Sequence, residues 1–279
     1  MSGYSPAWHQ SLPSGEVDAA VAISGDGRMI NYYIEGLAYL QKRMGFVGVY
    51  LDGIGYDRIA MLRLARTLSA GGADYYLPFH SGDDFKNPWT ERRAPPVVFY
   101  MEHLPYLTQL MFGEVFWFDG PEGYWMTNLA GLPFGIDNQF YPVPGPDYPF
   151  RSMLFASAPN VGASAAPIRA MWDRWGINTQ TKVLGYWDKN CPVKTNARDT
   201  YASVYANEGK ALICVASWAK ETTPVTLTVD WPALGLDPAK VRVSLPDIGS
   251  VQKPQATIDL SKPIAIEPGK GIVIGVAVR

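Results

Sequence analysis

Two acidic residues stand where a carboxylate could take part in catalysis. Asp52 follows the apolar run FVGVYL at residues 46–51, and Glu114 lies inside the apolar run LMFGEVFWF at residues 110–118. A carboxylate is costly to bury unless it is paired or hydrogen-bonded, and burial of a carboxyl group favours the protonated form that a general acid needs. We therefore predict Asp52 and Glu114 as a catalytic pair.

Each carboxylate also has a structural interpretation. Asp52 could hold its own loop in place, and Glu114 could form a buried salt bridge with Arg58 or Arg28. Asp57 precedes a predicted helix and fits an N-cap better than a catalytic role. Three acidic residues nevertheless stay open as members of the pair: Asp57, Glu102 and Asp119.

Further polar and aromatic residues accompany these carboxylates. Glycoside hydrolysis needs two carboxyl groups, one that protonates the leaving oxygen and one that attacks or activates water. Histidine and acidic side chains can orient such a pair or bind sugar hydroxyls, and aromatic rings can stack on sugar rings. We expect these residues to bind substrate: Tyr56, His80, Trp89, Glu102, His103, Trp117, Asp119 and Asp137. The set predicts a glycosidase, with retaining and inverting mechanisms both open.

Other chemistries find less support. The sequence contains no Walker A, HExxH or GxSxG motif. His80, Asp83 and Asp84 are close enough in the sequence to form a metal site, but we expect no metal and no cofactor. The main alternative is a carbohydrate-binding protein without catalysis on a vestigial barrel. A polysaccharide lyase with His80 or a tyrosine as base is a weaker one.

The composition limits the classes of partner that we expect the chain to bind. The 279 residues carry a formal net charge of -2 without a long basic run, so we expect no nucleic acid. No stretch of about 18 apolar residues occurs, so we expect no membrane span. Cys191 and Cys214 form no CxxC motif, and Cys214 lies in an apolar run typical of core. The expected partner is a carbohydrate.

The elements that must position these residues alternate between helix and strand. Apolar spacing predicts a helix over 28–44, capped by Asp26 and ended by Gly45, and a second helix over 59–69. The runs at 46–51 and 73–81 predict strands, which makes a parallel α/β sheet the expected arrangement.

Three more apolar runs predict strands. They are LMFGEVFWF, GLPFGI and SMLFAS, at 110–118, 131–136 and 152–157, and they bring the count to about five strands between residues 20 and 175. Two further helices are predicted near 99–110 and 165–175. After residue 180 the segments are short and β-rich, which predicts an all-β sandwich. The expected domains are 1–184 and 185–279.

Five blocks carry a resemblance to a known family. LDGIGYDR, LPFHSGDDF, YMEHLPYLTQLMFGE, GLPFGI and GYWDKNCPV resemble, in this order, blocks of proteins similar to glycoside hydrolase family 123. The resemblance runs from about residue 20 to the C-terminus. It implies a (β/α)8 barrel followed by a C-terminal β domain, and a secreted or periplasmic parent protein. The first residues lack the basic start and apolar core of a signal peptide, so the localisation of this chain stays open.

Two departures from that family matter. Its well-described members act on N-acetylgalactosaminides with an adjacent Asp-Glu pair, and this sequence contains no Asp-Glu dipeptide. A full barrel needs eight strands and about 250 residues. We therefore expect an incomplete (β/α)8 TIM-type barrel, which lacks an N-terminal segment, associates with itself, or is inactive alone.

Overall fold

The computed structural model describes residues 10–11, 17–18, 25, 27–52, 57–72, 74–80, 101–112, 116–128, 136–141, 148–157 and 159–279. Of residues 10, 11, 17, 18, 52 and 128 it describes only the backbone. The chain divides into two compact units. Unit 1 comprises residues 1–112 and 127–138, and unit 2 comprises residues 113–126 and 139–279.

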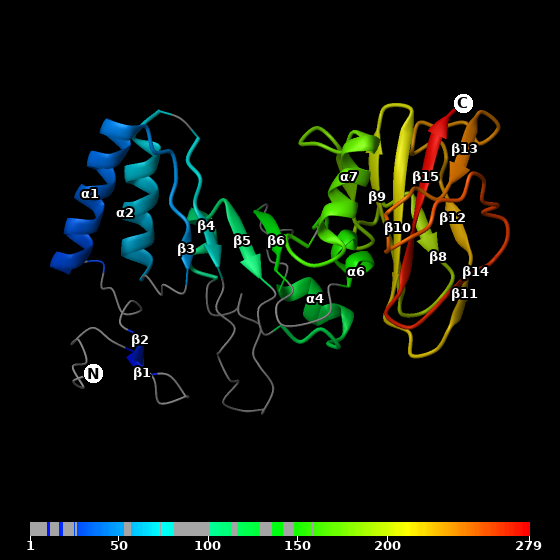
Figure 1. The fold of residues 1–279 in the computed structure, drawn as a ribbon, viewed down its shortest axis with the longest axis horizontal. Coiled ribbons are helices and arrows are strands. Elements are labelled where there is room, and N and C mark those ends of the chain that lie inside the picture. Colours follow the sequence, from blue (N-terminus) through cyan, green and yellow to red (C-terminus); the bar gives the residue numbers. More distant parts are fainter. Residues whose placement is uncertain are drawn as a thin grey trace. The chain divides into compact units, whose positions relative to one another are not determined.

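Two amphipathic helices form one layer of unit 1, α1 (Arg28–Met44) and α2 (Arg58–Ser69) (Figure 1). The predicted apolar stripe of α1 buries Ile30, Ile34 and Leu37 in a core shared with α2. Gly45 ends α1 with φ 71°, a left-handed conformation that glycine adopts without steric cost. Both predicted helices are confirmed, α2 beginning one residue earlier. The cap predicted at Asp26 is wrong, because Gly27 is the N-cap residue of α1 and no side chain caps the helix.

The strands of unit 1 form an open sheet. The strands are β3 (Leu51–Asp52), β4 (Pro78–His80), β5 (Gln109–Phe112) and β6 (Asp137–Phe140), in the order β3-β4-β5-β6. The pairs β3–β4 and β4–β5 are parallel, as predicted. Only Asp137 and Asn138 of β6 belong to unit 1. A separate antiparallel pair, β1 (Gln10–Ser11) and β2 (Val17–Asp18), precedes α1.

Two predicted elements are wrong. The helix expected near 99–110 is, in its described part, the short 3-10 helix η1 (Leu104–Tyr106) followed by β5. Pro105 near the start of η1 lacks the N–H that a longer helix needs. The strand expected at 152–157 is largely helix α6 (Pro149–Leu154), because a short apolar run fits a buried helix as well as a strand.

The C-terminal part of unit 2 is β-rich, as predicted (Figure 1). One antiparallel sheet has the order β13-β15-β10-β9-β7. Its strands are β7 (Lys182–Leu184), β9 (Thr200–Asn207), β10 (Lys210–Ser217), β13 (Val241–Ser244) and β15 (Gly271–Val278). A sandwich arrangement of this part stays a prediction, as does the boundary at residue 184.

Two small antiparallel sheets complete this region. They pair β8 (Val193–Thr195) with β12 (Leu227–Val229), and β11 (Thr223–Val225) with β14 (Ile264–Ile266). Residues of all three sheets share one hydrophobic core, which includes Val193, Ile213, Val225, Ile266 and Ile274. Cys191 and Cys214 are both buried and free, so Cys214 is core as predicted.

Helices of unit 2 pack against the sheet β13-β15-β10-β9-β7. The helix α7 (Ala165–Trp175) has the predicted bounds, and α6 contacts β9 and β10. Gly275 in β15 lets the Trp175 ring approach the sheet, because a Cβ atom there would lie 2.2 Å from the ring. The helix α4 (Glu122–Asn128) was not predicted, and its last two residues fall in unit 1. Within the described residues, no helix combines the length and apolar character needed to cross a membrane.

Candidate active site

The parallel register of unit 1 brings two predicted site residues together. Asp52, the last residue of β3, is the Cα partner of His80, the last residue of β4. His80 in turn faces Met111 of β5. Paired strands lie about 4.8 Å apart, so Asp52 and His80 are neighbours at the C-terminal edge of the sheet. Functional residues of parallel α/β folds gather at this edge.

The two histidines of unit 1 that the structure describes, His80 and His103, are largely buried. His80 is 8% exposed, and the Tyr50 ring stacks on it with ring centroids 6.5 Å apart and planes at 24°. His103 is 3% exposed, and its ring lies 6.4 Å from that of Phe79. Glu102, by contrast, is exposed in the turn before η1. The histidines are therefore held in defined positions, whereas Glu102 faces solvent.

Asp137 lies elsewhere than expected. It begins β6 instead of following a strand, and its backbone N–H donates to Thr108 O at 3.3 Å. Its Oδ2 accepts from Gln109 Nε2 at 3.0 Å, and Gln109 Oε1 accepts from the Tyr76 hydroxyl at 2.6 Å. Burial, then the charge of Asp137, raises the pKa of Tyr76. Asp137 thus joins the first residue of β5, at the opposite edge from His80.

Asp57 has the capping role favoured above. Its Oδ1 accepts from Ala60 N at 2.7 Å, at the start of α2, and its Oδ2 accepts from Gly25 N at 2.6 Å. Arg63 Nη1 donates to Gly25 O at 2.6 Å, so side chains of this region bind both the N–H and the carbonyl of Gly25. This geometry makes Asp57 a structural residue.

Several predicted residues fall outside the described part of the chain. They are Tyr56, Trp89, Glu114 and the pair Asp83 and Asp84, and the side chain of Asp52 is not described. The predicted catalytic pair of Asp52 and Glu114 therefore stays a prediction. Among the described residues, no cluster of three or more His, Cys, Asp or Glu side chains could hold a metal ion.

The two predicted residues of unit 2 with described side chains lie close together in the chain. Trp117 is half-buried, and its ring meets Tyr124 edge-on with centroids 5.4 Å apart. Asp119 is exposed, and its Oδ1 accepts from the Tyr148 hydroxyl at 2.9 Å. Burial, followed by this hydrogen bond to Asp119, raises the pKa of Tyr148.

Arg151 of α6 is the polar residue that sequence reasoning missed. It is 6% exposed, and its guanidinium carbon lies 4.5 Å from the ring centroids of both Tyr148 and Trp218. Nε and Nη2 donate to Ser217 O at 3.2 and 3.1 Å, and Nη1 donates to Phe118 O at 3.0 Å. An arginine inside the apolar run FRSMLF carried the same signal that singled out Glu114.

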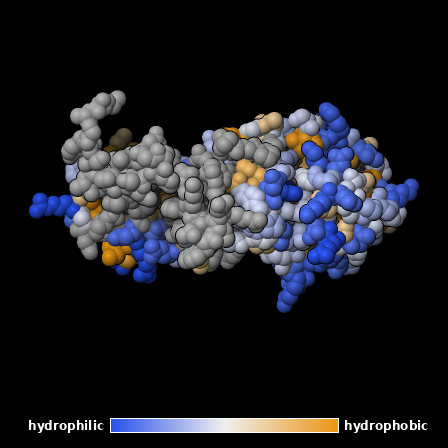
Figure 2. All heavy atoms as spheres, turned by 90° about the horizontal axis from the view of Figure 1, so that it is seen from below, coloured by the Kyte–Doolittle hydropathy of each residue, from blue (hydrophilic) through white to orange (hydrophobic). Residues whose placement is uncertain are grey.

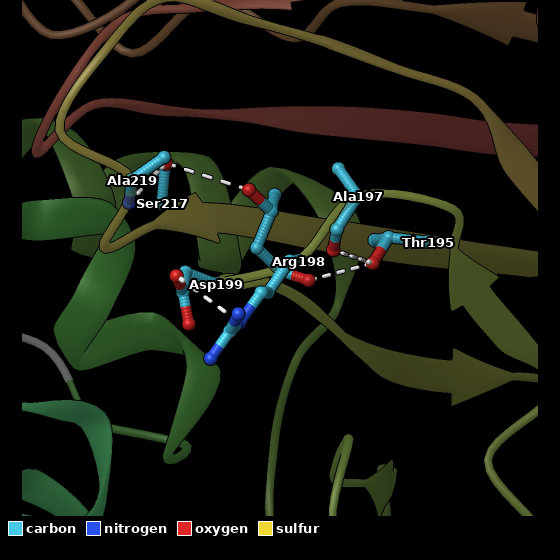
Figure 3. Close-up of polar contacts among 7 residues, drawn as sticks. Thr195, Ala197, Arg198, Asp199, Ser217 and Ala219 are labelled. Atoms are coloured by element: carbon cyan, nitrogen blue, oxygen red, sulfur yellow. Dashed lines mark hydrogen bonds and ion pairs between the residues drawn. The ribbon is translucent and has the colours of Figure 1, made fainter.

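The acceptor Ser217 is itself fixed by neighbouring hydrogen bonds. Its Oγ accepts from Ala219 N at 3.0 Å and from Thr200 Oγ1 at 3.4 Å. Figure 3 shows Ser217 and Ala219 at the end of β10, beside the chain segment that carries Thr195 and Asp199. The carbonyl that accepts from Arg151 therefore belongs to the last residue of β10, which neighbouring hydrogen bonds hold in place.

A second polar contact lies in the aromatic cluster of unit 2. The Tyr186 hydroxyl donates to Glu122 Oε1 of α4, and burial together with this bond raises the pKa of Tyr186 well above its ordinary value. Trp187 next to it stacks on Phe155 with ring centroids 5.7 Å apart and planes at 9°. Tyr186 and Trp187 belong to the GYWDKNCPV block, so two residues of this block contribute to the aromatic cluster of unit 2.

A cavity of about 650 Å³ opens beside Arg151 in unit 2. Asp119, Tyr148, Arg151, Ser250 and Lys270 supply polar groups to its walls. This volume is within the range of small-molecule sites. Charged groups, hydroxyls and an aromatic ring are groups that can bind a polar ligand such as a sugar.

Solved structures share the fold at low identity. A GH27 β-L-arabinopyranosidase from Geobacillus stearothermophilus matches with a TM-score of 0.52 and 11% identity, over 89% of this chain and 61% of that one. A variant of that enzyme in complex with arabinose matches with a TM-score of 0.52 and 10% identity, over 90% and 62%. An Anoxybacillus α-amylase matches with a TM-score of 0.50 and 8% identity, over 91% and 64%. The chain thus spans less than two thirds of each of these proteins.

Curated proteins and family models give different results. No curated protein matches the chain. The model described as the TIM-barrel domain of glycoside hydrolase 123 matches residues 1–161. The model described as the C-terminal domain of glycoside hydrolase 123 matches residues 164–277. Together they confirm the resemblance seen in the sequence blocks: the chain belongs to glycoside hydrolase family 123.

Proposed function

We propose that the chain is most of a glycosidase domain that cleaves O-glycosidic bonds with a pair of carboxylates. Asp52 acts as nucleophile or stabilising carboxylate, and Glu114 acts as general acid and base. The observation that carries the proposal is the register of Asp52 with His80 at the C-terminal edge of a parallel sheet. Family membership supports the reaction class.

The remaining predicted residues receive supporting roles. His80 and His103, which are nearly buried, orient the pair or bind sugar hydroxyls. Trp117 and Trp89 offer stacking faces, and these residues contact the sugar as well: Tyr56, Glu102, Asp119 and Asp137. For Asp137 this role requires a substrate that reaches the edge of the sheet where β5 begins.

A finer fold belongs to the same proposal. The open sheet of unit 1 would be part of a (β/α)8 barrel, and the three sheets after residue 180 would form a sandwich. The shared hydrophobic core of those sheets supports a layered arrangement. The four described strands of unit 1 would supply half of the eight strands that such a barrel contains.

The test is turnover of a panel of aryl glycosides by the full chain. Asp52→Asn removes a charge that either role requires and should abolish turnover, and Glu114→Gln should lower it by about 10²–10⁴-fold. Asp57→Asn is the matched control, because Asp57 caps α2 and an asparagine caps equally well. Unchanged turnover in Asp52→Asn would sink the assignment.

The stereochemistry of the product sharpens the same test. NMR of the first-formed sugar distinguishes retention from inversion of the anomeric centre. Retention requires carboxyl groups about 5 Å apart, and inversion requires about 6.5–9.5 Å. A wild-type chain that turns over no glycoside would contradict the proposal for this chain.

An open sheet favours a second candidate function. The described strands of unit 1 do not close into a barrel, which fits sugar binding without hydrolysis. That candidate expects oligosaccharide binding in calorimetry, lost on Trp117→Ala and kept on Asp52→Asn. Absence of binding would remove it.

A further inference from the structure

The cavity beside Arg151 has a charge that its described walls do not balance. Arg151 and Lys270 contribute two positive charges, and Asp119 contributes one negative charge. No ion pair among the described residues includes Arg151 or Lys270. A buried charge is normally paired, because removing an ion from water is costly. The cavity therefore favours a ligand with a negative charge.

The Arg151 guanidinium is held in place and has further N–H groups that can donate to a ligand. It lies between the rings of Tyr148 and Trp218, and backbone carbonyls hold three of its five N–H groups. Among the described residues, one N–H on each of Nη1 and Nη2 has no hydrogen-bond acceptor. Two donors on one planar group match the two oxygens of a carboxylate.

Gly269 leaves the guanidinium accessible from the cavity. It has φ 66°, and a Cβ atom there would lie 3.2 Å from Tyr148 Cε1 and 3.8 Å from Arg151 Nη2. A larger residue would therefore crowd both the ring and the guanidinium. Lys270 follows directly, so one turn supplies both an open approach and a second positive charge.

The same cavity also contains hydrogen-bond acceptors that can bind the hydroxyl groups of a ligand. Asp119 is exposed and uses Oδ1 to accept from Tyr148, so Oδ2 can accept from a ligand hydroxyl. Ser250 adds an exposed hydroxyl to the wall. A ligand that carries one carboxylate and several hydroxyls on a compact ring would use all of these groups. Hexuronic acids have this chemistry.

We propose that the cavity of unit 2 binds an acidic sugar, with the uronate carboxylate on Arg151 and Lys270 and ring hydroxyls on Asp119. The site goes beyond the proposed hydrolysis, because binding here needs neither Asp52 nor Glu114. A uronate residue of a glycan would be held by unit 2 whether or not the chain cleaves that glycan.

Calorimetry of the full chain with sodium D-glucuronate and D-galacturonate tests the proposal. D-glucose and D-galactose are the neutral counterparts, and at least one uronate should bind about tenfold or more tightly than its counterpart. Added salt should weaken uronate binding because the contact is ionic. Equal affinity for a uronate and its neutral counterpart, or no uronate binding, would overturn the proposal.

Variants locate the binding without disturbing the buried arginine. Lys270→Gln removes an exposed charge and should weaken uronate binding by about two- to fivefold. Ser250→Trp places a ring in the cavity and should abolish binding. Lys253→Gln is the matched control, an exposed lysine of unit 2 that does not line the cavity. Binding that Ser250→Trp leaves unchanged would place the sugar elsewhere and refute the site.

The failure of this proposal is distinguishable from that of the hydrolase. Uronate binding without turnover of any aryl glycoside would support the cavity and contradict hydrolysis. Turnover without uronate binding would do the reverse. Thermal unfolding of each variant confirms that a loss of binding does not come from a loss of fold.

Discussion

The sheets of unit 1 and unit 2 differ in the length of their strands and in how those strands are connected. In unit 2, β9, β10 and β15 are each eight residues long and antiparallel, and β9 and β10 join through a short turn. In unit 1, β3 has two residues, β4 three and β5 four, and long connections separate the parallel strands. A hairpin satisfies its backbone locally, whereas a parallel pair depends on a crossover.

The surfaces of the two units differ accordingly. Eleven of the thirteen large hydrophobic side chains that are exposed among the described residues belong to unit 1, and Tyr32, Met44 and Val47 are examples. Figure 2 shows one face of the molecule, on which hydrophobic residues, in orange, are visible on both units. The strand ends that carry Asp52 and His80 thus lie in the unit with more exposed apolar side chains among the described residues.

The largest expected effect tests whether the units are independent. Ile213 is fully buried in the core of unit 2, so Ile213→Ala should lower the free energy of unfolding by about 2–5 kcal/mol. Native-state hydrogen exchange should then show reduced protection in β9, β10 and β15, with α1 and α2 unchanged. Thr228→Ala, at an exposed position of β12, is the control. Equal loss of protection in α1 and α2 would show one cooperative body.

Alkaline pH should destabilise unit 2 more than unit 1. We expect this difference to be smaller than the effect of Ile213→Ala. Tyr148, Tyr186, Tyr201 and Tyr205 of unit 2 have pKa values raised mainly by burial, whereas unit 1 has Tyr75 and Tyr76. A raised pKa in the folded state gives stability that is complete below the unfolded-state pKa of 10.0 and is lost as pH rises above it. Each fully shifted tyrosine contributes a slope of up to about 1.4 kcal/mol per pH unit.

Tyr186→Phe sharpens that measurement. The variant keeps the ring and removes the hydroxyl that donates to Glu122, so unit 2 should lose stability less steeply above pH 10. Urea unfolding at several pH values between 8 and 11 measures the slope. A variant as steep as the wild type would show that Tyr186 does not couple folding to pH.

The smallest expected effect lies in unit 1. Asp57→Ala removes the N-cap of α2 and the acceptor of Gly25 N, and should cost about 0.5–2 kcal/mol. Hydrogen exchange of the first turn of α2 should rise while β9 and β10 stay protected. Asp57→Asn, which retains a capping oxygen, should restore most of the protection. An alanine variant with wild-type exchange would remove the capping role.

Regular, amphipathic elements were predictable from the sequence. The helices over 28–44 and 165–175 have the predicted bounds, because apolar spacing marks each helix and a following glycine marks its C-terminal end. The N-terminal cap of the first helix was less predictable, since it is Gly27 and not Asp26. The short apolar run at 152–157 was assigned the wrong structure, since its length does not distinguish a strand from a buried helix. Tertiary packing of α6 on β9 and β10 decides between the two.

The candidate site was predictable only where it follows from strand order. Asp52 and His80 each end an apolar run, so parallel pairing places them side by side. Asp137 was misplaced because the strand begins at this residue instead of ending before it. Arg151 and Trp218 meet across 66 intervening residues, and no local pattern indicates such a contact.

The distant partners of Arg151 have a consequence for folding kinetics. Its acceptors Phe118 and Ser217 lie 33 and 66 residues away in the chain, so the guanidinium reaches its place only after α6 and the end of β10 have docked. Contacts of such large sequence separation form late, because loop closure must come first. A substitution of Arg151 should therefore accelerate unfolding and leave the rate of folding nearly unchanged. Arg151 would thus slow the unfolding of unit 2 and so lengthen the lifetime of its folded state.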